Sequence, residues 1–581
     1  MQKGGIFISH LLKYFKGNRI QCFLSPFFKL IEAVFDLLVP FVISDLIDNG
    51  IANDDTGYIM WRFILLAALA LAGILFSVSA QYFASVAATS FSGRVRQALF
   101  EKIQTFSYKD TDEMGVSSMI TRITSDINQL QSGVNWTLRL FLRSPIIVFG
   151  AVICAFLISP SVALIFAIAV PVLLIIIFAI LLSTIPMYKN TQRKLDDLTR
   201  ITRENVTGVR VIRAFRNEEI ETEKFKNANK IHVMLQNAAG RISALLNPLT
   251  FLILNTGIIL VIYFGGVKVN DGILTTGQVI ALINYMSQIL VELIKLANTT
   301  ITVTRSLACA NRIGTVLTLK TGLDSYPEDA FVRNDDGSMV SFRDVSFSYG
   351  NGEIDTLSGI TFTAGKGETI GIIGGTGSGK TSLVNLIPRF YDIKSGQVFV
   401  EGRDVRTWDT DRLRHKIGIV LQKSVLFKGS VRDNLKWGNP DASDELLWDS
   451  LKYAQADEIV RNKSKGLDEP VEQGGTNFSG GQRQRLAIAR ALCGRPDILI
   501  LDDSASALDF ATEAALRKSL KELDFHPTTF IISQRVSSIR HADLILVLDH
   551  GVLAGCGTHD QLIQSCPLYR EIEQSQTGGR S

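Results

Sequence analysis

The sequence predicts an α-helical six-span transmembrane domain with long cytosolic helical extensions, fused to an α/β domain built around a P-loop. Three observations support this prediction. Apolar runs long enough to cross a bilayer fill roughly the first 300 residues and then stop. From about residue 331, short apolar runs alternate with amphipathic stretches, which is the pattern of βαβ units in an open sheet. A glycine-rich loop that ends in a lysine and a threonine, Gly374 to Thr381, follows one such apolar run.

The composition agrees with a membrane protein and narrows the possible partners. Hydrophobic residues make up 46% of the 581 residues, and the mean hydropathy is +0.21. The formal net charge of +4 is too small to indicate binding to nucleic acid, so no nucleic-acid partner is expected. The six cysteines are scattered and form no CxxC pair, which indicates reduced or membrane-buried thiols rather than disulfides or a zinc site.

Six segments qualify as membrane spans, because each supplies about 20 mainly apolar residues. They are Ile20–Ile43, Tyr58–Phe83, Trp136–Ile158, Val162–Ile185, Pro248–Val267 and Val279–Ala297. The first is the least apolar, since Lys29, Glu32 and Asp36 lie on it. Buried helices of a soluble domain are the alternative for the weaker segments, but six in succession favour spans.

The distribution of positive charge predicts the orientation of the spans. The loop after the first span, residues 44–58, carries four Asp and no Lys or Arg. The N-terminal segment instead carries Lys3, Lys13, Lys16 and Arg19. Because Lys and Arg are enriched on the cytosolic side, we expect a multi-pass protein of the lipid bilayer with N- and C-termini cytosolic. A bacterial plasma membrane is the expected location.

Two polar connections, Ala84–Asn135 and Pro186–Asn247, are far longer than turns. They are rich in helix formers and lack the Gly and Pro density of a disordered linker. We therefore expect them to continue the membrane helices into the cytosol, with turns at Asp110–Ser118 and Arg213–Glu221. Short helices at these turns would contact the domain that follows, and two solvated hairpins are the alternative.

Two pairs of charges lie inside the spans, where charge is costly and often functional. Glu292 and Lys295 are three residues apart on one helical face, so they can neutralise each other. Glu32 and Asp36 are four residues apart and could face a polar cavity. The pattern allows either pair to contact a ligand or to be hidden by packing.

The stretch ETIGIIGGTGSGKTSLVNLI carries the chemistry of the C-terminal half. Glu368–Ile373 predicts a strand, Gly374–Lys380 a glycine loop and Thr381 the start of a helix, which matches G-x-x-x-x-G-K-[ST] in full. Glycines let backbone N–H groups curl around phosphates, and the helix N-terminus adds partial positive charge. Lys380 would reach the β- and γ-phosphates, and the Thr381 hydroxyl a Mg²⁺ ion. The predicted phosphate-binding residues are Gly374, Thr376, Gly377, Ser378, Gly379, Lys380, Thr381 and Ser382.

These residues predict a nucleotide-binding domain over residues 339–581, with ATP and Mg²⁺ as cofactors. It would follow a membrane domain (1–320) and a linker (321–338). The apolar run Ile498–Leu501 ends in Asp502, which would act on Mg²⁺ directly or through water. A second motif, NFSGGQRQRLAIARAL, opens a basic, alanine-rich helix with Ser479, Gly480 and Gly481. Its N-terminus could hold another phosphate, with an ordinary helix start as the alternative.

The order of these motifs resembles that of the ATP-binding cassette (ABC) transporters, in which FSGGQ stands between a P-loop and a run such as ILILDD. Six spans ahead of the cassette resemble the exporter class, and the resemblance covers essentially the whole chain. It implies that Tyr349 stacks on adenine and that Gln422 joins Mg²⁺ and senses the membrane domain. It also implies that residues 506–509, which end in Asp509, cross to a partner, and that the two cytosolic turns are coupling helices.

In this family two cassettes pair head to tail, and each ATP lies between the P-loop of one chain and the signature of the other. The signature residues here are Ser479, Gly480, Gly481 and Gln482. By this resemblance one chain is half a transporter, so a second half-transporter chain is implied as its partner.

Two residues depart from the pattern of family members that hydrolyse ATP. Asp503 stands where those members carry the Glu that polarises the attacking water. Its carboxylate falls short by one C–C bond, about 1.5 Å, and a misplacement of about 1 Å can lower a rate on the order of a hundredfold. Gln534 stands where they carry a His that contacts the γ-phosphate, and an amide cannot titrate near neutral pH.

The chain is therefore similar to the degenerate-site subunit of a heterodimeric, multidrug-type ABC exporter. This hypothesis implies ATP-driven export of an amphipathic or hydrophobic drug, lipid or peptide, with hydrolysis at the composite site shared with the partner. A homodimer that works slowly with Asp503 and Gln534 is one alternative. A nucleotide-gated channel or regulatory membrane protein is another.

Overall fold

The computed structural model describes residues 10–319, 323, 326–327, 337–350, 354–504 and 508–577. The chain forms two compact units. The first consists of Met1–Gln104 and Ser117–Leu319, and the second of Thr105–Val116 and Lys320–Ser581. Most of the predicted linker, 321–338, lies outside the described residues.

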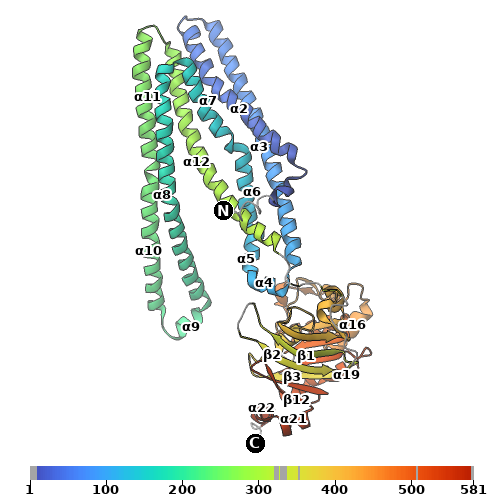
Figure 1. Cartoon of the computed structure of the whole chain (residues 1–581). Helices are drawn as coiled ribbons and strands as arrows, with labels where there is room; N and C mark the ends of the chain where they lie inside the picture. The colour runs from blue at the N-terminus through green and yellow to red at the C-terminus, as the bar shows by residue number, and fades with distance from the viewer. Residues whose placement is uncertain are drawn as a thin grey trace. The chain divides into compact units, whose positions relative to one another are not determined.

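The first unit is helical wherever a secondary structure element is described. Its long helices are α2 (Arg19–Asp45), α3 (Thr56–Gln104), α7 (Arg143–Ile158), α8 (Pro160–Thr207), α10 (Glu218–Ala244), α11 (Leu246–Asn270) and α12 (Thr276–Thr318) (Figure 1). Shorter helical pieces are η1 (Lys13–Phe15), η2 (Leu46–Ile51), α5 (Val116–Thr121), η3 (Arg122–Asp126), α6 (Ile127–Trp136), η4 (Thr137–Phe141) and α9 (Val209–Ala214). Helix α8 packs against both α10 and α11, and α2 packs against α3 (Figure 1).

Five helical stretches of the described chain are long and apolar enough to cross a membrane. They are Thr56–Gln104, Val116–Ile158, Pro160–Thr207, Glu218–Asn270 and Thr276–Thr318. They contain five of the six predicted spans and continue well beyond most of them. The remaining predicted span coincides with α2, a helix of 27 residues. Helix α2 is not among the five because its charged residues Lys29, Glu32 and Asp36 lower its apolar character, so the count of six spans stays a prediction.

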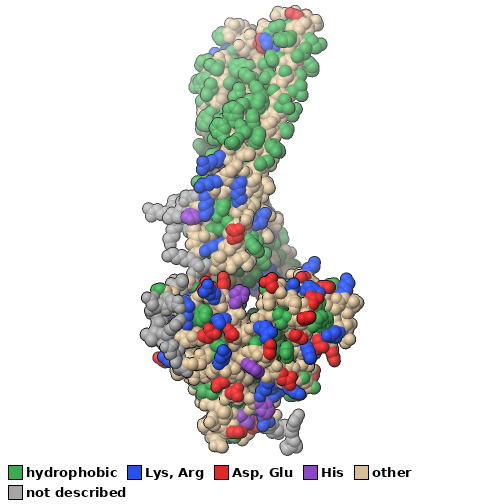
Figure 2. All heavy atoms as spheres, turned by 90° about the vertical axis from the view of Figure 1, so that its right-hand side faces the viewer, with side chains coloured by type: hydrophobic (Ala, Val, Ile, Leu, Met, Phe, Trp, Pro, Cys, Tyr) green, Lys and Arg blue, Asp and Glu red, His purple; other side chains and the backbone are tan. Residues whose placement is uncertain are grey.

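Apolar side chains cover the outside of this helical unit. Leu75 on α3 is 68% exposed and Leu157 on α7 is 75% exposed. Figure 2 shows such side chains gathered into a broad green area over the helices, with Lys and Arg side chains along its lower border. An apolar surface of this extent indicates contact with lipid rather than water.

The second unit is built on two main sheets. The antiparallel sheet has the order β2-β1-β4-β5, with strands β1 (Val340–Phe347), β2 (Leu357–Ala364), β4 (Ser395–Val400) and β5 (Arg403–Asp404). The second sheet has the order β12-β11-β3-β10-β9-β6. Its strands are β3 (Thr369–Gly374), β6 (Ile417–Val420), β9 (Ile498–Asp502), β10 (Thr528–Ile532), β11 (Leu544–Asp549) and β12 (Val552–Gly557). All neighbours in this sheet are parallel except β11 and β12.

Helices and a small strand pair complete this unit. The helices are α13 (Lys380–Asn385), η5 (Val405–Thr407), α14 (Thr410–His415), α15 (Val431–Lys436), α16 (Asp444–Tyr453), α17 (Asp457–Arg461), η6 (Gly466–Asp468), η7 (Gln473–Gly475), α18 (Gly480–Cys493), α19 (Phe510–Lys521), α20 (Val536–Ile539), α21 (His559–Ser565) and α22 (Pro567–Thr577), and the pair is β7 (Gly429–Ser430) with β8 (Pro470–Val471). One apolar cluster joins both main sheets to α13, with Phe342, Leu383 and Phe530 fully buried in it. This cluster packs α13 against β3.

Helix α4 (Tyr108–Met114) belongs to the second unit although it lies between α3 and α5 in the sequence. Ser107 caps it in a capping box with Asp110. The ring of Tyr108 stacks on Phe390 at a centroid distance of 4.1 Å, and the Tyr391 hydroxyl donates to Asp112 at 2.6 Å. The prediction of a short helix that contacts the following domain is therefore confirmed for α4. The second predicted turn, Arg213–Glu221, covers the end of α9 and the start of α10, and both helices belong to the first unit.

Candidate functional site

The candidate nucleotide site forms at the carboxyl ends of four neighbouring parallel strands. The order β3-β10-β9-β6 brings together the glycine loop after β3, Gln534 after β10, Asp502 and Asp503 at the end of β9, and Gln422 after β6. The register pairs Ile532 with Asp502, so the ends of β10 and β9 are level. Ligands of open α/β sheets bind outside such carboxyl ends. The fold therefore assembles residues that are far apart in the sequence.

The ammonium group of Lys380 hydrogen-bonds the glycine loop that precedes it. Its Nζ donates to the carbonyl oxygens of Gly374 and Gly375 at 3.0 and 2.7 Å, and to Ser378 Oγ at 3.4 Å. Burial lowers the pKa of Lys380, although two nearby carboxylates oppose the shift. A phosphate oxygen would be a stronger partner for this ammonium than neutral carbonyls.

Gly379 sets the direction in which the loop enters α13. Its φ is +96°, in the left-handed region that favours glycine. A Cβ here would lie 2.7 Å from Leu357 Cδ2 and 3.1 Å from the carbonyl oxygen of Thr356. Both the conformation and the crowding therefore require glycine. Of the other predicted loop residues, Thr376 and Gly377 are exposed.

The hydroxyl of Thr381 donates to Asp502 Oδ1 and Oδ2 at 3.1 and 3.0 Å. Asp502 is only 3% exposed. Burial, reinforced by the neighbouring Asp503, raises the pKa of Asp502, against the hydrogen bond from Thr381. A buried carboxylate whose charged form is disfavoured gains most from a cation.

Thr381 and Asp502 fit a Mg²⁺ ion, because hydroxyl and carboxylate oxygens are the donors that this hard cation prefers. When bound, the ion would neutralise phosphate charge. Gln422 is exposed, and its side chain hydrogen-bonds Asp503. Its predicted place among the Mg²⁺ ligands stays a prediction.

Tyr349 lies beside the glycine loop. Its hydroxyl is 2.9 Å from Ser382 Oγ in α13, and its ring meets Phe347 and Tyr391 edge-on at 4.8 and 5.1 Å. Tyr349 as a whole residue is 43% exposed. An aromatic face fixed by its neighbours but open to solvent is available for stacking, as the prediction about adenine requires.

Asp503 and Gln534 both follow central strands of the site. Asp503 has a φ of +47°, and its N–H donates to the carbonyl oxygen of Ile532 at 3.1 Å. Burial raises the pKa of Asp503, against the hydrogen bond from Gln422. Gln534 is exposed, and its backbone carbonyl oxygen accepts a hydrogen bond from Gln576 Nε2 at 2.8 Å.

The signature residues form the start of α18. Ser479 is the N-cap and forms a capping box with Gln482, whose Oε1 accepts from the Ser479 N–H at 3.0 Å. Ser479 and Gly480 are exposed, and Gly481 is partly exposed. The motif therefore presents a well-formed helix N-terminus to the outside of this chain.

Asp509 caps α19 by accepting hydrogen bonds from the N–H and hydroxyl of Thr512 at 2.8 and 2.9 Å. These bonds lower the pKa of Asp509. Two other residues predicted to cross to a partner, Ser506 and Ala507, lie outside the described residues.

Two residues of the site were missed by sequence reasoning. Gln484 in α18 is 5% exposed and donates from Nε2 to the carbonyl oxygen of Asp503 at 3.2 Å. Arg535, beside Gln534, pairs with Glu513 of α19 at 3.7 Å. The contact from Gln484 links the signature helix to Asp503 of the same chain. The two residues are 19 apart in sequence, and no local pattern connects them.

A cluster of charges joins three helices of the membrane unit. Arg143 of α7 contacts Glu292 of α12 at 2.6 Å and Asp36 of α2 at 2.7 Å, with Glu32 of α2 at 3.7 Å. Lys295 pairs with Glu292 at 2.8 Å, as the spacing predicted. Each carboxylate thus pairs with a cation, and this attraction offsets part of the desolvation cost of burying the charges. Sequence analysis identified the acids but not the arginine between them.

Further pairs complete this network. Lys29 pairs with Glu32 and donates to Ser77 Oγ at 3.0 Å, and Ser144 Oγ donates to Glu292 Oε2 at 2.8 Å. Beside the network is a cavity of about 420 Å³. Its lining residues are Asp36, Val39, Pro40, Ile43, Arg143, Ile147, Asn284, Ser287, Gln288, Val291, Glu292 and Lys295. The lining combines charged, amide and aliphatic groups.

Comparisons with known proteins agree with this architecture. The family profile described as "ABC transporter transmembrane region" matches residues 22–293, and "ABC transporter" matches residues 357–506. The uncharacterized ABC transporter ATP-binding protein MT1311 of Mycobacterium tuberculosis is 36% identical over 552 residues, covering 94% of both chains. The uncharacterized ABC transporter ATP-binding protein YfiB of Bacillus subtilis is 33% identical over 571 residues, covering 98% of both.

Among solved structures, a bacterial Atm1-family ABC exporter with ATP bound matches with a TM-score of 0.81. The identity is 22%, over 97% of this chain and 99% of that one. A helical membrane unit fused to an α/β unit with a phosphate loop defines a half-transporter. The chain belongs to the ABC transporter family, and its fold is that of an Atm1-family ABC exporter. ATP-driven transport of the ABC exporter type follows from this membership, and such exporters work as dimers in a membrane.

Proposed function

We propose that this chain is one half of a heterodimeric exporter. Its own P-loop site binds Mg²⁺ and ATP but hydrolyses ATP poorly, while its signature motif completes the active site of a partner chain. Turnover then occurs mainly at the composite site that holds the partner's P-loop. The observation that carries this proposal is the pair Asp503 and Gln534 at the ends of adjacent strands.

Asp503 supports poor hydrolysis through its length and its surroundings. Its backbone is tied to Ile532 on β10, and Gln484 donates to its carbonyl oxygen. These bonds oppose the backbone shift that would let a shorter acid reach the position of a Glu carboxylate. The missing C–C bond is about 1.5 Å, and about 1 Å of misplacement can lower a rate on the order of a hundredfold.

Gln534 supports the same conclusion independently. An amide can hydrogen-bond a phosphate oxygen, but it carries no charge and does not titrate near neutral pH, whereas imidazole does. Residue 534 therefore cannot supply a cation to the developing charge on the γ-phosphate. Two losses at one site favour retention for binding over turnover.

The groups that hold nucleotide are intact, which supports binding. Lys380 is free to exchange two carbonyl oxygens for phosphate, and Thr381 with Asp502 supplies the oxygens for Mg²⁺. Tyr349 offers a fixed aromatic face. A site that had lost its function altogether would not need all three features.

The exposed signature supports a role at a partner's site. Ser479 and Gly480 form a capped helix N-terminus that is open to solvent in this chain. Such an N-terminus attracts phosphate through its N–H groups and its dipole. The partner would supply the P-loop, with Glu and His at the positions of Asp503 and Gln534.

The cavity beside Arg143 supports an amphipathic substrate. Asp36 and Lys295 lie on its lining with side chains 42% and 43% exposed, so both charges can reach a bound molecule. Aliphatic residues such as Ile43 and Val291 share the lining. A drug, lipid or peptide with both polar and apolar parts would satisfy both kinds of surface.

The decisive experiment uses the transporter assembled with its partner, which we expect to be a second cassette exporter encoded in the neighbouring reading frame. The partner's catalytic Glu is first changed to Gln, so that only the site of this chain can hydrolyse ATP. Asp503→Glu combined with Gln534→His is then expected to raise the remaining ATPase rate by about tenfold or more. Asp441→Glu with Gln564→His makes the same chemical changes at exposed positions and should leave the rate unchanged.

The slow homodimer makes a different prediction, because the chain purified alone would then hydrolyse ATP slowly but measurably. If the chain alone hydrolyses ATP and loses that activity on Asp503→Ala, the site is not degenerate and the heterodimer proposal is wrong. A nucleotide-gated channel is distinguished by vesicle experiments, because it would pass ion current without ATP-dependent accumulation of a dye or peptide.

A further inference from the structure

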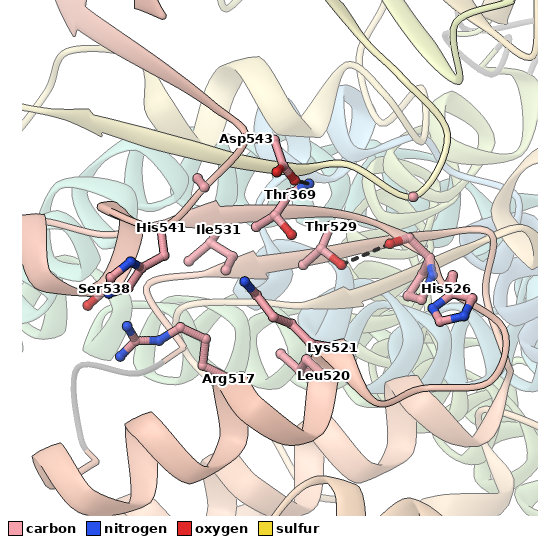
Figure 3. Close-up of a pocket in the computed structure, with 13 residues that line it drawn as sticks. Thr369, Arg517, Leu520, Lys521, His526, Thr529, Ile531, Ser538, His541 and Asp543 are labelled. Atoms are coloured by element: carbon pink, nitrogen blue, oxygen red, sulfur yellow. Dashed lines mark hydrogen bonds between the residues drawn. The ribbon is translucent and has the colours of Figure 1, made fainter. Parts of the chain in front are cut away.

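The second unit carries another pocket, at the opposite edge of the parallel sheet from the glycine loop. It has a volume of about 290 Å³. Thr369, the first residue of β3, and Thr529, the second of β10, line it, so it lies at the amino ends of these strands (Figure 3). The glycine loop follows the carboxyl end of β3. The pocket is therefore separate from the nucleotide site.

Basic side chains dominate this pocket. Arg517 and Lys521 reach it from α19, His541 from the turn after α20, and His526 from the loop before β10. In Figure 3, Arg517 and His541 lie toward one end, His526 lies toward the other, and Lys521 lies between them. Burial lowers the pKa of His541, and the positive charges of Arg517, Arg540 and Lys521 add to the shift. The two cations Arg517 and Lys521 face one acid, Asp543, so the lining carries a net positive charge.

Ser538 gives a second, independent indication of a ligand. Its side chain lines the pocket and is only 5% exposed. Its Oγ has no hydrogen-bond partner among the described residues. A buried hydroxyl without a partner is unfavourable, and a bound acceptor would supply that partner.

Asp543 is the single acid among the described lining residues. Its Oδ2 accepts a hydrogen bond from the backbone N–H of Thr369 at 2.8 Å. The Thr529 hydroxyl is likewise engaged, since it donates to the Pro527 carbonyl oxygen at 3.1 Å (Figure 3). Arg517 Nη1 donates to the carbonyl oxygen of Ser537 at 3.2 Å. Ser538, Lys521 and the other N–H groups of Arg517 are therefore the contacts for a ligand.

The lysines at the end of α19 also stabilise that helix. Lys518 and Lys521 lie in the last turn of α19, where cations interact favourably with the helix dipole. Stabilisation of α19 does not account for His541 or for the unpartnered hydroxyl of Ser538, because both residues lie on another segment.

We propose that this pocket binds a small phosphate-type oxyanion. Arg517 and Lys521 would contact its negative oxygens, and Ser538 would donate a hydrogen bond to it. The volume is at the lower limit for ligand sites, which fits a phosphate group and excludes a large drug-like molecule. The site is independent of the heterodimer proposed above.

Two helices connect the pocket to the nucleotide site. Helix α19 starts at its cap Asp509 and carries Arg517 and Lys521 at its other end. Helix α20 starts two residues after Gln534 and carries Ser538. An oxyanion that fixes these ends would couple to ATP affinity, and such coupling is reciprocal.

Binding is tested by isothermal titration calorimetry on the full-length protein in detergent, with excess Mg²⁺ and a non-hydrolysable ATP analogue filling the P-loop. Inorganic phosphate and glycerol phosphate form two arms, which distinguish a free ion from a phosphate ester. We expect one site, weakened about tenfold by Lys521→Ala. Lys518→Ala removes the same charge from the same helix outside the pocket and should change the affinity less than twofold.

Ser538→Ala is the second variant, because its folding does not depend on a lost internal hydrogen bond. It should weaken the oxyanion about threefold or more and leave the melting temperature unchanged or higher. Absence of binding in both arms, or equal weakening by Lys518→Ala and Lys521→Ala, would overturn the site. For the coupling, phosphate should shift the apparent ATP affinity of the wild type differently from that of Lys521→Ala. Equal shifts, reflecting only competition at the P-loop, would overturn the coupling.

Discussion

The hydroxyl of Thr381 donates to both carboxylate oxygens of Asp502, at 3.1 and 3.0 Å. Thr381 follows the glycine loop, whereas Asp502 ends β9, which is separated from β3 by β10. The pair therefore joins the glycine loop to the end of β9 within this chain. Because the fold itself holds Thr381 and Asp502 together, it reduces the ordering that Mg²⁺ and ATP must bring about on binding.

Asp502→Asn keeps the shape of this side chain but removes its charge. We expect the Mg²⁺ enhancement of ATP binding to fall about 10- to 100-fold, because a charged oxygen is replaced by a neutral amide. The measurement is a titration with a fluorescent ATP analogue at varied Mg²⁺. An enhancement as large as in the wild type would show that Asp502 does not hold the ion.

The same substitution changes how stability depends on pH. Burial raises the pKa of Asp502 in the folded state. In the pH window between the pKa of Asp502 in the unfolded chain and its pKa in the folded chain, the folded chain therefore binds more protons than the unfolded chain. Stability contributed by this group therefore falls as pH rises through that window, and the charged form disfavours the fold above it. Melting temperatures of the ligand-free protein, measured across that window, should show this fall in the wild type but not in Asp502→Asn.

Gly379→Ala should impair the phosphate loop. Its φ of +96° and the 2.7 Å approach to Leu357 both oppose a Cβ, and strain of this kind costs about 1–3 kcal/mol. We expect weaker ATP binding and a lower melting temperature. Gly375→Ala is the matched control in the same loop, because no atom lies within 4 Å of its added Cβ. Equal effects of the two substitutions would contradict this account.

Tyr108→Ala should loosen α4 within the second unit. The stacked pair of Tyr108 and Phe390 is worth about 0.5–1.5 kcal/mol beyond its area. Amide hydrogen exchange over residues 108–114 should therefore accelerate by about 2- to 12-fold. Tyr188→Ala removes an exposed tyrosine from α8 and should leave this exchange unchanged. Unaltered exchange in Tyr108→Ala would mean that the stack does not hold the helix.

Arg143→Met should destabilise the membrane unit by about 3–5 kcal/mol, because it leaves buried carboxylates without their shared cation. Adding Glu292→Gln should restore part of the loss, since one of those charges is then removed. Thermal unfolding in detergent measures both. Arg200→Met breaks an exposed pair with Glu204 and should cost less than about 1 kcal/mol. If Arg143→Met lowers the stability by no more than Arg200→Met does, the charges of the cluster are effectively solvated.

Much of the fold was predictable because its signals are local. The glycine loop, its preceding strand and its following helix are adjacent in sequence, so their spacing predicts both structure and chemistry. Five of the predicted spans are likewise recognisable from apolar length alone. The first predicted span was the exception, because the charged residues of α2 make it too polar to be recognised in this way.

Contacts between distant segments were not predictable. Nothing in the local pattern assigns Arg143 to Glu292, or Gln484 to the carbonyl oxygen of Asp503. The membership of α4 in the second unit was only partly anticipated, since Tyr108 and Phe390 are 282 residues apart in number. A stacked ring pair or a shared cation produces no periodic pattern in the sequence.

The sequence by itself predicted which residues can meet phosphate and Mg²⁺, and its resemblance to the ABC transporters predicted that Asp503 and Gln534 stand at the catalytic positions. Local spacing is sufficient for the phosphate loop, because that motif is only a few residues long. Only the tertiary structure decided which side chains neutralise the membrane charges and where basic residues surround an unpartnered hydroxyl. Those outcomes depend on burial and on the order of strands and helices, which arise when remote segments pack together.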